Sequence, residues 1–103
     1  MPTVSEELKA AINLFESRNA EYGTCYTKHG KIMKAFFPDG VLLKTELDFF
    51  LWNKFENIIG KCARISAAMD MGHHWHEDSS KDIIVYSAMA LEKLSMEKDK
   101  HNE

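Results

Sequence analysis

The sequence predicts an all-α protein with a four-helix, bundle-like fold. Apolar residues recur at spacings of three and four in four segments, which is the period of a helix that buries one face. Residues that favour turns separate these segments, and no stretch shows the convincing alternation of a strand. Because 103 residues suit one hydrophobic core, we expect a single domain over residues 1–103.

The first two predicted helices have clear C-terminal ends. The first covers residues 5–22, and Gly23 ends it because glycine readily adopts the conformation that follows a helix. The second covers residues 26–37, and the sequence Pro-Asp-Gly at 38–40 predicts a turn directly after it.

Capping residues mark the starts of the first and third helices. Thr3 followed by Glu6 resembles a capping box, and Thr45 is the expected N-cap of a third helix that runs to about residue 71. Gly60 lies inside this helix, where either close helix packing or ligand access accounts for it. The apolar residues of the third helix form a seam at spacings of mostly four and three: Leu47, Leu51, Phe55, Ile58, Cys62, Ile65 and Met69.

The fourth predicted helix covers residues 79–98. A charged tail begins at about residue 97, and we expect it to fray because it has no apolar side chain with which to pack.

Composition limits the classes of function. The net charge is −3 and 45% of the residues are hydrophobic, which is typical of a soluble globular protein. The acidic balance argues against a nucleic-acid polymer as partner but leaves small anionic ligands open. No apolar run approaches the ~20 residues that cross a membrane, and no secretion signal precedes the first helix, so we expect a cytoplasmic protein. Cys25 and Cys62 lack metal-site spacing, and we interpret each as a small buried hydrophobe.

The large apolar side chains near the start of the third helix predict self-association. Phe49, Phe50, Trp52 and Phe55 exceed what one side of a small bundle can cover. The alternative is that Phe49 or Trp52 is simply half exposed. We therefore expect a homo-oligomer.

A stripe of acidic residues opens the fourth helix. Asp78 and Asp82 lie one helical turn apart, and Tyr86 follows a turn later on the same face. Carboxylates in this arrangement can bind a divalent metal ion. The alternative for Asp78 is helix capping, with Asp78 or Ser79 as the N-cap, since acidic residues are favoured at a helix N-terminus.

Polar side chains gather on the third helix, on the side away from its seam. Lys61 and Arg64 suit phosphate oxygens, and Glu56 could share a metal ion with the aspartates. Solvated surface charge is the alternative reading of this set. Its members are Asn53, Glu56, Asn57, Lys61 and Arg64.

The loop before the fourth helix contains potential ligands at His73, His74 and His76. A zinc site, a ligand contact and a plain polar loop are all compatible with this pattern, and the close spacing weakens the zinc interpretation. Tyr22 and Tyr26 could likewise stack on a nucleotide base or pack at helix ends.

A set of short motifs, taken in order, resembles a known family. It comprises Glu-Tyr-Gly at 21–23, His-Gly-Lys-Ile-Met at 29–33, Phe-Phe-Pro-Asp-Gly at 36–40, Lys-Cys-Ala-Arg at 61–64 and Glu-Asp-Ser at 77–79, with Asp82 and Tyr86. The set resembles small phage-encoded proteins of the MazG-like group, and more narrowly their nucleotide-modification-associated domains. The resemblance extends from about residue 16 to residue 94.

The resemblance implies an all-α, MazG-type nucleoside triphosphate pyrophosphohydrolase fold. In that family, helix carboxylates bind magnesium and water attacks between the α and β phosphates. Here Asp78, Asp82 and Glu56 would be the catalytic and metal-binding residues. The expected nucleotide contacts are Lys61, Arg64, Tyr86, Tyr22 and His29. If the protein is phage-encoded, it would act in the host cytoplasm.

The sequence also departs from the family pattern. MazG enzymes carry an acidic cluster of the form EExxE on one helix and an ExxD motif on the next. This sequence lacks the first cluster, and in the second motif Ser79 stands three positions before Asp82, where the family has Glu. Three functions therefore remain open: a magnesium-dependent nucleotide pyrophosphohydrolase, a non-catalytic protein that sequesters a nucleotide signal, and a structural helical oligomer. The thin carboxylate set favours nucleotide binding over hydrolysis.

Overall fold

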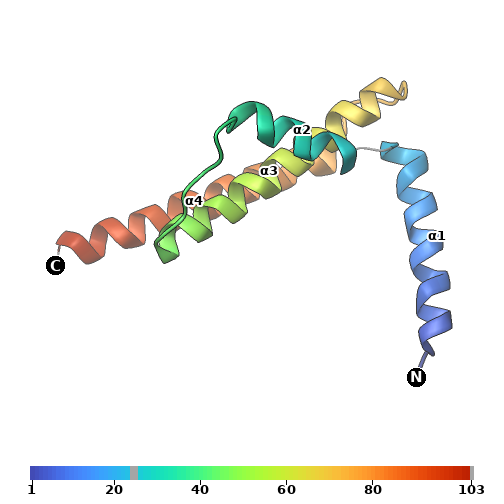
Figure 1. Ribbon diagram of the computed structural model, residues 1–103, viewed down its shortest axis with the longest axis horizontal. Helices are drawn as coiled ribbons and strands as arrows, with labels where there is room; N and C mark the ends of the chain where they lie inside the picture. Colours follow the sequence, from blue (N-terminus) through green and yellow to red (C-terminus); the bar gives the residue numbers. More distant parts are fainter. Residues whose placement is uncertain (24–25, 103) are drawn as a thin grey trace.

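The protein is described by a computed structural model that covers residues 1–23 and 26–102. These residues form four helices and no strand (Figure 1). The helices are α1 (Val4–Tyr22), α2 (Tyr26–Phe36), α3 (Glu46–Asp70) and α4 (Glu77–Asn102). The predicted all-α class and the four predicted helices are confirmed.

Both predicted capping motifs are present. At α1, the Thr3 hydroxyl accepts from the Glu6 N–H at 3.2 Å, and the Glu6 carboxylate accepts from the Thr3 N–H at 3.1 Å. Thr45 caps α3 in the same way with Asp48. Two backbone N–H groups donate to Asp48, that of Thr45 and that of Lys44, and they lower the pKa of its carboxyl group. Each box satisfies helix N–H groups that would otherwise lack a partner.

The two predicted turns end their helices as expected. Gly23 follows α1 with a φ of +64°, and its N–H donates to the Asn19 carbonyl at 2.8 Å. A side chain at Gly23 would also meet the sulfur of Met71 at 2.9 Å. After α2, Gly40 has a φ of +86° and donates to the Phe37 carbonyl at 3.0 Å, which closes the turn. Glycine suits both positions because a positive φ is costly for other residues.

The centre of the molecule is an antiparallel pair formed by α3 and α4, with α2 lying beside α3 (Figure 1). Small residues on α3 let α4 approach closely, and the Ser79 side chain on α4 is buried in this contact. The buried apolar residues are Ile59, Ala63, Ile65, Ala67 and Ala68. All of them lie on α3, so the core of one chain is small.

The predicted seam of α3 is wrong at two positions. Met69 is 54% exposed and Cys62 is exposed, so neither belongs to the core. The alanines at 63 and 67 are buried instead, at 2% and 5% exposure, because helix packing depends on close approach as well as on side-chain size. Cys25, for which burial was also predicted, lies outside the described residues.

Aromatic rings join α2 and the following turn to α3. The Phe37 ring lies 5.3 Å from Trp52 and 5.6 Å from Phe55, and Phe36 lies 6.2 Å from Phe55, all between ring centroids. These edge-on contacts cover part of the apolar surface that the sequence placed here. Phe49 stays 56% exposed.

α4 differs from its prediction at both ends. It begins at Glu77 rather than 79, so neither Asp78 nor Ser79 is its N-cap; the His76 ring accepts from the Ser79 N–H at 3.3 Å instead. The helix includes the charged tail and runs to Asn102, beyond the predicted end at 98. Lys93 and Lys100 lie 3.4 and 3.6 Å from the Glu97 carboxylate, and such pairs support an exposed helix.

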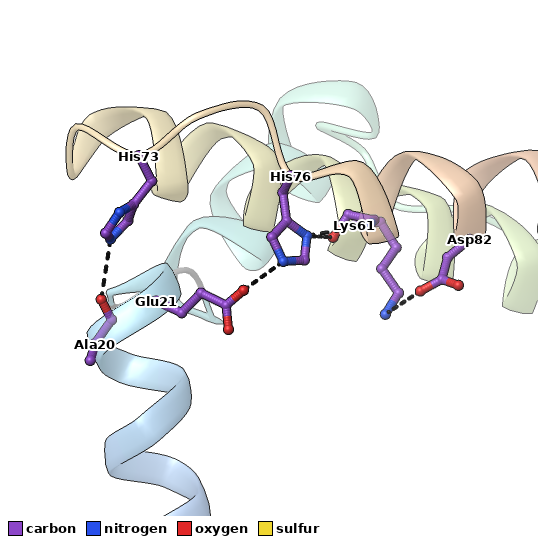
Figure 2. Close-up of polar contacts among 7 residues, drawn as sticks. Ala20, Glu21, Lys61, His73, His76 and Asp82 are labelled. Atoms are coloured by element: carbon purple, nitrogen blue, oxygen red, sulfur yellow. Dashed lines mark hydrogen bonds and ion pairs between the residues drawn. The ribbon is translucent and has the colours of Figure 1, made fainter.

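α1 leaves one end of the α3–α4 pair and points away from it, so one chain does not close into a four-helix bundle (Figure 1). Two histidines hold its C-terminal end (Figure 2). The His73 Nε2 donates to the Ala20 carbonyl at 3.4 Å, and the His76 Nε2 donates to the Glu21 carboxylate at 2.8 Å. The arrangement is extended: the radius of gyration is 17.4 Å, against about 13 Å for a compact chain of this length.

None of the helices in the described ranges is long and apolar enough to cross a membrane.

Candidate functional site

A cavity of about 690 Å³ lies where α2, α3 and α4 meet. Ligand-binding cavities typically have volumes of roughly 300–1,000 Å³, so its size suits a small molecule. Three helices supply its lining: Tyr26, His29 and Gly30 from α2; Glu56, Asn57, Gly60, Lys61, Ala63 and Arg64 from α3; and Tyr86 from α4.

Two cations lie on the α3 wall of this cavity. Lys61 and Arg64 are three residues apart and therefore project from the same side of the helix. The Lys61 Nζ lies 3.1 Å from the Asp82 carboxylate on α4, as Figure 2 shows. The Lys61 side chain is only 17% exposed, whereas that of Asp82 is 47% exposed. The ion pair thus fixes the lysine at the cavity and leaves its carboxylate partner partly in solvent.

Aromatic and polar side chains complete the lining. Tyr26 and Tyr86 come from different helices, and the Lys54 Nζ lies 6.0 Å from the centroid of the Tyr86 ring, within reach of a cation–π contact. The Asn57 Nδ2 donates to the side-chain Oδ1 of Asn53 at 3.4 Å, which holds its side chain along the helix. The cavity therefore combines positive charge, aromatic faces and hydrogen-bonding groups.

Gly60 lies where α2 crosses α3. A Cβ atom at this position would lie 3.7 Å from the His29 Nδ1 and 3.9 Å from its Cε1, which is ordinary contact distance. Close packing therefore does not require a glycine here; Gly60 also lines the cavity, and access to a ligand stays the other predicted reason for it.

Polar side chains also tie α2 to α3. The Lys28 ammonium pairs with the Asp70 carboxylate and donates to the Ser66 hydroxyl at 3.2 Å. Lys28 belongs to α2, the helix that also carries the lining residues Tyr26 and His29. Its contacts therefore help to hold this side of the cavity in place.

The structure brings five of the sequence-predicted site residues to one cavity: Glu56, Lys61, Arg64, Tyr86 and His29. Asp82 reaches its edge through Lys61. Neither aspartate of the predicted stripe lines the cavity: Asp78 is exposed, whereas Asp82 pairs with the lining residue Lys61. The side chain of Tyr22 lies outside the described residues.

Within the described ranges, no three side chains of His, Cys, Asp or Glu are gathered in a way that could hold a metal ion. The loop histidines have other roles. His73 contacts the end of α1, and both ring nitrogens of His76 are engaged: Nε2 donates to Glu21, and Nδ1 accepts from the Ser79 hydroxyl at 2.6 Å. The structure therefore gives no support to the zinc interpretation of this loop.

Three features of the site escaped sequence reasoning. Gly30 and Ala63 line the cavity but carry no chemical signal in the sequence. The pairing of Lys61 with Asp82 joins residues on different helices, and it depends on how α3 and α4 align. The spacing of four between Asp82 and Tyr86 predicts that both lie on the same side of α4. It does not predict which other helix lies next to that side.

Comparisons with protein-family models, with curated proteins and with solved structures found no match to this chain. The resemblance to MazG-like proteins therefore stays a prediction from the motifs.

Proposed function

We propose that the cavity between α2, α3 and α4 binds a nucleotide or a nucleotide-derived small molecule. The observation that carries this proposal is the convergence of two cations and two tyrosines from three helices on one cavity of suitable size. Lys61 and Arg64 would hold phosphate oxygens, because charged donors make the strongest hydrogen bonds to such groups. Tyr26 and Tyr86 would contact the base through their ring faces.

Binding without turnover is the form of this function that the site supports best. Lys61 already has the Asp82 carboxylate as its partner, and Asp78 lies away from the cavity. A carboxylate committed to a lysine is less free to coordinate a metal ion. A protein with this site would sequester a nucleotide signal rather than hydrolyse it.

Magnesium-dependent pyrophosphohydrolysis is the second candidate, and the position of Glu56 favours it. Glu56 lines the cavity together with Lys61 and Arg64. Magnesium can be held by one or two carboxylates when waters and substrate phosphates supply its other ligands. If the protein is a pyrophosphohydrolase, the magnesium ion would bind together with the nucleotide, and Glu56 and Asp82 would be its protein ligands.

We also propose that the protein acts as a homo-oligomer. Its buried apolar residues are few, and many large apolar side chains are exposed on α1 and α4. A chain with so small a core gains stability by covering this surface with another subunit.

Incubation with a nucleotide panel separates the candidates. The purified protein is mixed with each nucleotide, with and without magnesium, and the supernatant is analysed before and after heating. Intact nucleotide released only by heat supports binding, whereas monophosphate and pyrophosphate support hydrolysis. If neither appears with any nucleotide of the panel, the structural oligomer is the better account.

A pair of lysine variants locates the binding. Lys61→Met should weaken binding by roughly 10- to 100-fold, since a hydrogen bond to a charged group contributes about 1.5–3 kcal/mol. Lys81→Met removes the same charge from an exposed position on α4 that does not line the cavity, and it should leave binding unchanged. Equal loss in both variants would place the ligand elsewhere.

A further inference from the structure

α1 carries an apolar stripe that stays largely exposed among the residues that the structure describes. Four residues form the stripe at spacings of four and three: Val4, Leu8, Ile12 and Phe15. Their exposures range from 53% to 77%. The N-terminal part of the helix points away from the α3–α4 pair (Figure 1), and the four stripe residues are all exposed.

We propose that α1 is a dimerisation arm whose apolar stripe packs against a second copy of this chain. This deepens the proposed self-association by naming the surface that mediates it. It does not depend on nucleotide binding.

The amount of exposed surface matches what a stable dimer needs. The chain has an accessible surface of 7863 Å², whereas a compact monomer of 11.8 kDa has about 5,900 Å². The excess is roughly 2,000 Å² per chain. Two chains that cover this excess would bury about 4,000 Å² in total, which lies within the range of obligate homodimers.

A second copy of the chain also has an exposed apolar surface on which the α1 stripe can pack. The side of α4 turned away from α3 exposes apolar residues over several turns, including Ile84 and Leu91, which are 68% and 66% exposed. Each copy thus has both an outward apolar helix and an uncovered apolar face. Such surfaces can cover one another reciprocally in a symmetric pair.

The charge of α1 argues against a lipid surface as the occupant. Helices that lie on membranes are rich in Lys and Arg, which attract anionic lipids. α1 carries more acidic than basic residues: Glu6, Glu7, Glu16 and Glu21 against Lys9 and Arg18. An apolar stripe with acidic flanks fits a protein surface better than an anionic bilayer.

The stripe also reaches the cavity. The Phe15 ring lies 6.3 Å from the Tyr26 ring, centroid to centroid, and Tyr26 lines the proposed nucleotide site. Packing of a second copy on the stripe would restrain Phe15 and through it Tyr26. Dimerisation could in this way change the affinity of the cavity for its ligand. This effect rests on the proposed nucleotide binding, whereas dimerisation through α1 does not.

The test is the molar mass in solution, measured by light scattering after size-exclusion chromatography without nucleotide. Wild type should have about twice the 11.8 kDa mass of the chain. Leu8→Glu with Ile12→Glu places two charges in the stripe and should raise the dissociation constant at least about 100-fold, giving a monomer. The matched control, Asn13→Glu with Ser17→Glu, adds the same charge to the opposite side of α1 and should remain a dimer.

Two results would overturn the proposal. One is a monomeric wild type, which would point to a different protein or a lipid surface as the occupant. The other is a stripe variant that stays as dimeric as its control. If the stripe variant loses its helical circular dichroism, Leu8→Ala with Ile12→Ala decides, because alanine keeps the helix: a dimer that dissociates more readily than the control supports the arm, and one as stable as the control contradicts it.

Because these measurements contain no nucleotide, their failure is distinct from failure of the proposed nucleotide site. A dimer that binds no nucleotide of the panel would support the dimerisation arm and contradict the proposed nucleotide site.

Discussion

Replacement of Asp82 with Asn removes the carboxylate that neutralises Lys61, and we expect it to strengthen the binding of anions to the cavity. Asn has nearly the same shape as Asp, so the lysine keeps a hydrogen-bonding partner while the local charge becomes more positive. The expected gain distinguishes an ion-pair role for Asp82 from a role as a metal ligand.

The size of the effect follows from the ion-pair geometry. The Lys61 Nζ lies 3.1 Å from Asp82, so a phosphate oxygen about 3 Å from the same Nζ lies at most roughly 6 Å from the carboxylate. Repulsion over that distance is about 0.7 kcal/mol in water and about 2.8 kcal/mol at an effective dielectric constant of 20. Because the Asp82 side chain is 47% exposed, the lower half of this range applies, and affinity should rise by about 3- to 20-fold.

The assay is calorimetric titration with inorganic pyrophosphate, which carries phosphate charge without requiring knowledge of the base. The buffer contains a chelator and little salt, because salt screens the effect. Asp78→Asn is the control: it makes the same change of charge one turn earlier, at an exposed residue that does not line the cavity.

An unchanged or weaker affinity for pyrophosphate in Asp82→Asn would refute this reasoning. If Asp82 instead binds magnesium, the variant should lose affinity for the magnesium complex and show no gain when the metal is absent.

Two further predictions concern stability. Gly60→Ala should raise the melting temperature by about 4–8 °C, since Ala is favoured by up to ~1 kcal/mol inside a helix and its Cβ would meet His29 at ordinary contact distance. The same methyl group enters the cavity and should weaken ligand binding; a lower melting temperature would show that α2 and α3 are too close for it. Asp48→Asn should destabilise the protein at neutral pH. Hydrogen bonds from the backbone of Thr45 and Lys44 hold the pKa of Asp48 below its ordinary value of 3.8, so its contribution is complete above that pH and is lost as the pH falls through the lowered folded value. Urea unfolding at neutral pH should therefore give a lower free energy of unfolding for Asp48→Asn than for wild type. In acid, below the lowered pKa, this difference should disappear, and a difference that persists there would contradict the prediction.

Local signals predicted the ends of α1, α2 and α3, though not those of α4, because capping and turn formation are local. Thr3 and Thr45 satisfy N–H groups within the next three residues, and Gly23 ends α1 through its own backbone conformation. The prediction failed where partners come from elsewhere in the chain. The C-terminal end of α1 contacts His73 and His76, more than fifty residues later, so its placement could not be predicted from local signals.

The candidate site was partly predictable for a similar reason. Glu56, Lys61 and Arg64 share one side of α3, so helical spacing alone places them together. Spacing could not reveal that His29 on α2 would face them, or that Asp82 would pair with Lys61 while Asp78 stays exposed. These outcomes depend on how separate helices align, which periodicity does not determine.

The most direct test of the central claim is a crystal structure of the protein with the nucleotide that it retains most tightly from the panel. The account predicts ligand density in the cavity between α2, α3 and α4, with phosphate oxygens within hydrogen-bonding distance of Lys61 and Arg64. Nucleotide density at another surface, with this cavity filled only by solvent, would contradict it.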